Sequence, residues 1–188
     1  MLNKIFMKKH KEWYVALLVF IAIVPSAFSQ VEWTIEEDYK IAFSGRGAEG
    51  TFSELRGTII FDPEDLGHSK FDVSINPITI ATGNKTKDKH ARGDSWFDVE
   101  NFVMIKFVSA DIREEENGYL ANGKLVLHGI EQDAKIYFDF TSSRPDQGSF
   151  QGRMTVNRTD FGIEGPAFSF MVGDEFEIEI VVPVKAKP

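Results

Sequence analysis

Cysteine is absent from this chain of 188 residues. The absence excludes disulfides, thiol nucleophiles, zinc–thiolate sites and iron–sulfur clusters. The fold must therefore be stabilised by burial of apolar side chains, and the chain is long enough to bury a sizeable core in one domain.

Basic residues are scarce relative to acidic ones. The chain has 21 Lys and Arg against 29 Asp and Glu. Residues 1–29 hold four of the lysines and one glutamate, so residues 30–188 keep 17 basic and 28 acidic side chains, a net charge of −11. Taken as a whole, such a surface repels nucleic acid and anionic headgroups. We expect no nucleic-acid partner, and the charge favours an aqueous compartment.

Long apolar runs are also scarce, and the longest lies near the N-terminus. Four lysines precede an apolar run of 11 residues at 14–24, and small residues follow it. The run is shorter than the roughly 20 residues that a membrane-spanning helix needs. We interpret residues 1–29 as a signal peptide that is cleaved between Ser29 and Gln30. Residues 30–188 then form one periplasmic or secreted domain.

Alternation of apolar and polar residues dominates the remainder of the chain, and this period predicts β-strands. Long antiparallel strands with one apolar face close into an up-and-down barrel or stack as a sandwich. The last strand either closes the barrel or pairs with a second copy in a homodimer, and Pro183 argues against long edge pairing. The expected strands cover 38–47, 50–62, 69–81, 102–113, 117–128, 132–142, 149–157 and 174–184.

One connection differs from the short turns between the other strands. Residues 82–101 form a long, polar and charged segment with the aromatic pair Trp96-Phe97 near its end. A connection of this length inside a compact β domain is uncommon and often functional. We expect it to form a lid or a mouth.

Phenylalanine is abundant, with 17 in the chain and 14 of them after residue 29. Flat, stiff rings suit an ordinary core or the wall of an apolar cavity, and an eight-stranded barrel is wide enough for a packed interior or one small ligand. A register slip of one residue would invert the facing of a whole strand. The side chains that we expect to line a pore are Phe43, Phe71, Val73, Ile75, Phe107, Leu125, Leu127, Ile136, Phe138, Met154 and Phe176.

Patterns for catalysis or metal binding are weak. The histidines lack the spacing of metal ligands. Asp88 and His90, with Asp94 beyond them, either act as acid and base, hold a metal, or fix an irregular loop through caps and hydrogen bonds. Arg158 is also open to two interpretations: an ion pair with Asp160 that stabilises a turn, or a guanidinium that faces a polar ligand head. We expect no cofactor and no metal.

Three sequence blocks stand out in order along the chain. The first is T-G-N-x-x-x-D-x-H at 82–90, which is followed by W-F-D-V-E at 96–100. The second is G-K-L-V-L-H-G-I at 123–130, and the third is N-R-T-D-F-G-I at 157–163. Together, these blocks resemble the YceI-like polyisoprenoid- and lipid-binding family. The chain departs from the usual family pattern at Trp96, where a phenylalanine is common, so the identity of the ligand does not carry over.

The resemblance implies a lipocalin-like antiparallel barrel of eight extended strands with a short helical segment in the 83–101 connection. Members of the family are exported binding proteins rather than enzymes. They hold one apolar chain, such as an isoprenoid quinone, a polyprenyl lipid or a fatty acid derivative, for transport or storage. The candidate mouth residues are Asp88, His90, Trp96, Phe97 and Arg158, with Trp96-Phe97 as an apolar plug.

Three functions stay open at this point. The first is the lipid carrier, which implies transient contact with a membrane or a membrane protein. The second is an envelope stress or adhesion module with a packed interior, whose function resides on its surface. The third is an enzyme, which requires that two of Asp88, His90, Asp94 and His128 converge on a common cavity.

Overall fold

The computed structural model describes residues 31–167 and 169–188, so the expected signal peptide and its cleavage site lie outside the described residues. These residues form one antiparallel sheet, with an α-helix, α1 (Lys85–Arg92), and short 3₁₀ turns in the connections. The turns are η1 (Leu66–His68), η2 (Pro77–Thr79), η3 (Arg158–Phe161) and η4 (Ser169–Met171). The strands are β1 (Glu32–Ile35), β2 (Lys40–Gly45), β3 (Ala48–Phe52), β4 (Arg56–Ile60), β5 (Lys70–Ile75), β6 (Ile105–Glu115), β7 (Gly118–Leu127), β8 (Ile130–Arg144), β9 (Gln147–Asn157) and β10 (Glu175–Ala186).

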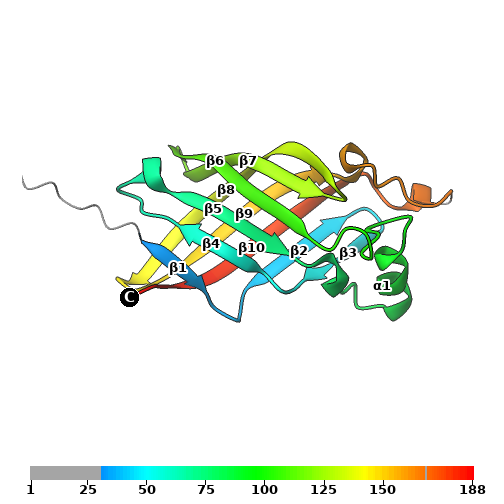
Figure 1. Cartoon of the computed structure of the whole chain (residues 1–188), viewed down its shortest axis with the longest axis horizontal. Coiled ribbons are helices and arrows are strands. Elements are labelled where there is room, and N and C mark those ends of the chain that lie inside the picture. The colour runs from blue at the N-terminus through cyan, green and yellow to red at the C-terminus, as the bar shows by residue number, and fades with distance from the viewer. Residues whose placement is uncertain (1–30, 168) are drawn as a thin grey trace, which may run out of the picture.

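The sheet closes on itself because β1 pairs with both β4 and β10 (Figure 1). The strand order is β1-β4-β5-β6-β7-β8-β9-β10-β2-β3, and the β1–β10 pairing completes a ring of eight strands. β2 pairs with the first half of β10, and β1 pairs with the last residues of β10. β1 and β2 therefore lie one after the other along the same edge of β10. The expected closed antiparallel barrel of eight extended strands is confirmed.

Strand β10 uses both of its edges within the chain. One edge pairs with β9 from Glu175 to Lys185, and the other pairs first with β2 and then with β1. The strand therefore closes the barrel, and it leaves no long edge for a second copy. Of the two roles that its sequence allowed, the structure shows closure.

The expected strands differ most from the structure at three places, and the other bounds shift by at most three residues. The expected strand 50–62 is interrupted between β3 and β4, where Glu54 adopts a φ of 59°, outside the extended region. The expected strand 69–81 ends at Ile75, because Pro77 begins η2 and its ring nitrogen has no N–H to continue a ladder. β1 was not expected as a separate strand.

Aromatic rings fill one end of the barrel. We call Phe61 and its five ring neighbours the aromatic cluster. Phe61 has no exposed surface, and the five ring centroids lie between 5.1 and 6.3 Å from its own. The Trp33 indole N–H also donates to the Phe61 carbonyl at 2.9 Å. Edge-to-face rings packed in this way close the barrel at this end. The neighbours are Phe71, Tyr119, Phe138, Phe140 and Phe150.

The opposite end of the barrel is formed by four connections, and we call it the mouth end. They are 46–47, 76–104, 128–129 and 158–174, and α1 lies in the longest of them (Figure 1). The short helical segment expected within 83–101 is thus confirmed. Within the two described stretches, no helix has the length and apolar character needed to cross a membrane.

Candidate ligand-binding cavity

The barrel encloses an apolar cavity of about 400 Å³. This volume lies within the range of small-molecule sites in proteins. Phe71, Phe138 and Phe150 of the aromatic cluster border it, so the cluster forms the floor. Four of the five polar or charged residues on its border lie at the mouth end. The five are Ser74, Thr82, Lys87, His90 and Arg158.

All eleven side chains that the alternation pattern placed inside the barrel border this cavity. The alternation continues to further wall positions that the sequence analysis did not name. Ile41 precedes Phe43 by two residues, and Ile178 and Ile180 follow Phe176 at the same spacing. The period-2 signal was available at these positions. The wall residues that were missed are Ile41, Phe52, Leu55, Ile59, Ile80, Ile105, Phe150, Val156, Ile163, Ile178, Ile180 and Val182.

Side-chain hydrogen bonds fix the N-terminal turn of α1 to the residues that precede it. The Asn84 side chain accepts hydrogen bonds from the backbone N–H groups of Thr86 and Lys87 at 3.0 and 3.1 Å. The Asp88 carboxylate accepts from the hydroxyl and the backbone N–H of Thr82, both at 2.7 Å. These bonds, the hydroxyl one foremost, hold the pKa of Asp88 below its ordinary value of 3.8. Asp88 does not border the cavity, so here it fixes the loop.

The cavity reaches the surface beside α1. Lys87 and His90 are exposed, yet both border the cavity, and the half-buried Ala91 borders it next to them. Gly47 and Val172 border it from the two neighbouring connections. Together these five residues form the mouth of the cavity.

Two neighbouring connections of the mouth end are joined by one backbone hydrogen bond and one side-chain hydrogen bond. The Gly173 N–H donates to the Arg46 carbonyl at 2.8 Å, and the Arg46 guanidinium donates to the Phe170 carbonyl at 3.3 Å. At Gly47, where φ is +82°, an added Cβ would lie 2.3 Å from the Met171 carbonyl oxygen. Only glycine allows the backbone at Met171 and Val172 to approach the β2–β3 turn this closely.

Trp96 and Phe97 both border the cavity, and they contact different elements. Phe97 packs edge-on against Phe52 of β3, with 5.6 Å between ring centroids. Trp96 lies between Arg158 and Gly165. A Cβ added at Gly165 would lie 2.9 Å from the indole, so the backbone at Gly165 approaches the ring closely. The aromatic pair therefore links the 93–101 turn to β3 on one side and to the 158–174 connection on the other.

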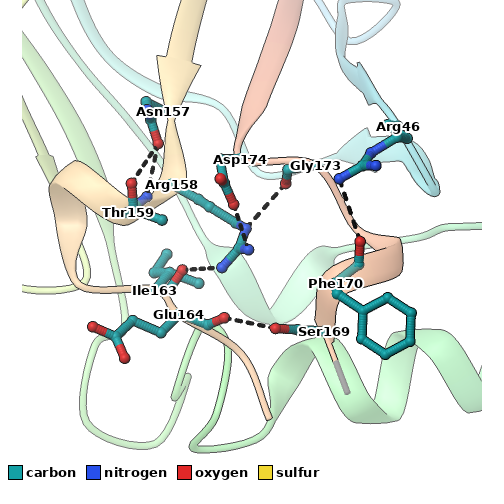
Figure 2. A network of polar contacts seen from close by, with 10 residues as sticks. All are labelled: Arg46, Asn157, Arg158, Thr159, Ile163, Glu164, Ser169, Phe170, Gly173 and Asp174. Carbon is teal, nitrogen blue, oxygen red and sulfur yellow. Dashed lines mark hydrogen bonds and ion pairs between the residues drawn. The ribbon is translucent and has the colours of Figure 1, made fainter. Parts of the chain in front are cut away.

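Arg158 is buried, with 8% of its surface exposed, and all three guanidinium nitrogens donate to protein oxygens (Figure 2). Nε donates to the Gly173 carbonyl at 3.0 Å, Nη1 to the Ile163 carbonyl, and Nη2 to Asp174 Oδ1 at 2.6 Å. The ion-pair partner is Asp174 and not the expected Asp160. The backbone bond from Arg158 N–H to the Asp174 carbonyl brings that distant carboxylate alongside. This geometry favours the role of stabilising a turn.

The residues considered for acid–base chemistry do not converge. No hydrogen bond joins any two of Asp88, His90, Asp94 and His128, and of the four only His90 borders the cavity. His128 Nδ1 lies 3.2 Å from the Phe161 carbonyl, and its ring packs against Phe102 at an interplanar angle of 56°. Nor do residues 31–167 and 169–188 contain a group of three or more His, Asp or Glu arranged to hold a metal ion.

Comparisons with known proteins agree with this geometry. Among sequence relatives, a UPF0312 protein of Pseudomonas savastanoi is 32% identical over 136 residues, which cover 69% of this chain and 71% of the relative. A UPF0312 protein of Shewanella oneidensis is 25% identical over 189 residues, which cover 92% and 96%.

Solved structures share the fold at lower identity. Burkholderia cenocepacia BcnA superposes with a TM-score of 0.74 at 20% identity, over 80% of this chain and 99% of that one. A polyisoprenoid-binding domain from Saccharophagus degradans, implicated in plant cell wall breakdown, gives a TM-score of 0.58 at 12% identity, over 82% and 98%. A family model described as the YceI-like domain matches residues 24–184. Since this match spans most of the chain, the protein belongs to the YceI-like family, and the resemblance of the three sequence blocks is confirmed.

Proposed function

We propose that this protein binds one molecule with a long apolar chain, such as a polyisoprenoid, an isoprenoid quinone or a fatty acid derivative, inside the barrel. The observation that carries the proposal is the apolar cavity of about 400 Å³, which is closed by aromatic rings at one end and reaches the surface at the other. Membership of the YceI-like family and the fold shared with a polyisoprenoid-binding domain support it.

The distribution of polar groups gives the ligand an orientation. The chain lies with its tail toward the aromatic cluster and its head at the mouth, where Lys87 and His90 are within the cavity border. The Arg158 donors are engaged by protein oxygens, so this residue positions the mouth and does not bind the head. Each buried methylene contributes about 0.8 kcal/mol, so a chain of about 16 carbons gains on the order of 12 kcal/mol before the costs of ordering it.

The same proposal includes export and a non-enzymatic role. Residues 1–29 direct the chain out of the cytoplasm, and the mature protein transports or stores its ligand in the periplasm or beyond. Within the part of the chain that the structure describes, Asp88, His90, Asp94 and His128 do not converge on the cavity, and this supports binding over catalysis. Mass spectrometry of the protein recovered from its cells tests the proposed export, because cleavage of the signal peptide should leave Gln30 as the mature N-terminus.

The direct test is a binding measurement on delipidated protein. A ligand that binds only the folded state stabilises it by about 2.7 kcal/mol at a hundredfold excess over Kd. We expect an isoprenoid quinone or a long-chain fatty acid to raise the melting temperature, and a short-chain acid with the same carboxylate to leave it unchanged. If none of a series of quinones, polyprenyl lipids and fatty acids shifts the melting temperature, the proposal fails.

A further inference from the structure

The exposed apolar side chains of this barrel gather at its mouth end. Among the described residues, seven large apolar side chains are exposed. Five belong to connections at that end, and a sixth, Ile130, is the first residue of β8, directly after the 128–129 turn. The seventh, Tyr137, lies on the barrel wall in β8. Large exposed apolar patches mark sites of interaction with a protein or a membrane. The six at the mouth end are Ile78, Val103, Met104, Ile130, Phe170 and Met171.

Phe170 and Met171 are the most exposed of the set, with 71% of each surface accessible. They lie in η4, which is held in place by polar contacts. The Ser169 hydroxyl donates to the Glu164 carbonyl at 2.9 Å, and Arg46 donates to the Phe170 carbonyl. Figure 2 shows the Phe170 ring directed away from the Arg158 network. An ordered turn therefore presents two apolar side chains to the surroundings at the edge of the mouth.

Helix α1, at the same end, carries a charge opposite to that of the domain. Its sequence KTKDKHAR holds four basic residues and one acid, and that acid, Asp88, is engaged by Thr82. Residues 30–188 as a whole carry a net charge of −11. Acidic residues follow the helix at Asp94, Asp98 and Glu100, so α1 is a local basic segment within an acidic domain.

We propose that the mouth end docks on the surface of an anionic phospholipid bilayer. Phe170 and Met171 enter the interface between headgroups and acyl chains, and the lysines of α1 face the anionic headgroups. The acidic barrel wall is repelled by the same surface, so the protein is oriented with its mouth toward the bilayer. The inference rests on the proposed function, because a ligand with an apolar chain enters and leaves at this end without crossing water.

Vesicle co-sedimentation tests the docking. The protein is produced from the full-length gene, and its mature N-terminus is established by mass spectrometry. It is mixed with vesicles of phosphatidylcholine alone, or of equal parts phosphatidylcholine and phosphatidylglycerol. Two double variants alter the docking surface without touching the cavity: Phe170→Ser with Met171→Ser, and Lys85→Glu with Lys89→Glu. Matched controls are Tyr137→Ser on the wall, and Lys70→Glu with Lys185→Glu at the closed end.

We expect the wild type and both controls to sediment with the anionic vesicles. Each mouth-end variant should bind these vesicles more weakly, by about tenfold or more. Docking is overturned if the wild type stays in the supernatant, or if both mouth-end variants sediment like the controls at an unchanged melting temperature. A second copy seated on this patch, seen as a dimer that the Phe170→Ser, Met171→Ser variant dissociates, overturns it as well. Extraction of lipid from the same preparations separates docking on the bilayer from lipid binding in the cavity. Protein that retains a ligand but does not dock would contradict docking and leave the proposed function standing.

Discussion

The guanidinium of Arg158 lies over the Trp96 indole, 5.4 Å from the ring centroid. This contact joins two connections of the mouth end that are distant in sequence, the turn after α1 and the segment between β9 and β10. Arg158 is itself fixed by three donated hydrogen bonds, so it positions the indole at the cavity border. The cation–π contact therefore holds the two loops together beside the mouth.

Loss of the indole should affect ligand retention more than folding. In the Trp96→Ala variant the cation–π contact and a piece of the cavity border are removed, which costs about 1 kcal/mol of stability at a half-buried site. We expect the bound lipid to dissociate several-fold faster while the melting temperature changes little. Exchange of a fluorescent lipid and a thermal melt measure the two quantities. Equal losses in both would show that Trp96 belongs to the core, and Tyr137→Ala, an exposed aromatic on the wall, should leave both unchanged.

Replacement of Arg158 should destabilise the whole protein. Arg158→Met leaves the Ile163 and Gly173 carbonyls and the Asp174 carboxylate without their donor, at a cost of about 3 kcal/mol. Arg158→Lys keeps the charge but cannot reproduce three donors in a planar fork, so it should recover less than half of the loss. Urea unfolding gives the free energies. Arg153→Lys, at an exposed position of β9, is the matched control, and a full recovery in Arg158→Lys would contradict the account.

The bonds from Thr82 to Asp88 should make the anchoring of α1 sensitive to acid. The folded-state pKa of Asp88 lies below the ordinary 3.8, so its contribution to stability is present above pH 3.8 and is lost as the pH falls through the folded-state pKa. We expect the wild type to melt above Asp88→Ala at neutral pH and the difference to shrink below pH 3.8. Asp94→Ala, which removes a nearby carboxylate that accepts from the Ser95 hydroxyl and not from Thr82, is the matched control. A difference that persists in strong acid would show that the carboxylate charge is irrelevant.

Filling the cavity should displace the ligand. Met154 faces the cavity from β9 and Thr155 faces outward beside it, so Met154→Trp and Thr155→Trp place the same side chain on opposite sides of one strand. Adding atoms to a packed core costs about 1–3 kcal/mol of stability. At Met154 the cost is smaller, because the added ring atoms can enter the open cavity. We expect Met154→Trp to fold and to bind lipid at least tenfold more weakly, as measured by titration calorimetry, and Thr155→Trp to bind like the wild type.

The barrel and the facing of its strands could be predicted from the sequence, because alternation reports burial directly. Phe71, Val73 and Ile75 point inward as their spacing requires, and the same holds for Phe176 with Ile178. The break between β3 and β4 could not be predicted in this way. Glu54 carries no turn signal, and its positive φ is imposed by the tertiary structure.

The site was predicted in part, and the difference follows from sequence separation. The contact between Asp88 and Thr82 is local, six residues apart, and the interpretation of Asp88 as a loop-fixing group agrees with it. The partner of Arg158 is not local. Asp174 reaches it only because β9 and β10 are neighbours in the sheet, so a nearby carboxylate, Asp160, was a plausible but wrong choice.

The most direct test of the central claim is native mass spectrometry of the protein purified from its own cells without detergent. We predict a population whose mass exceeds that of the mature chain by one lipid, and whose extra mass is released by organic extraction. The same measurement on Met154→Trp should show the mass of the chain alone. Wild-type protein that is lipid-free in every preparation, and that stays empty after incubation with quinones, polyprenyl lipids and fatty acids, would contradict the account.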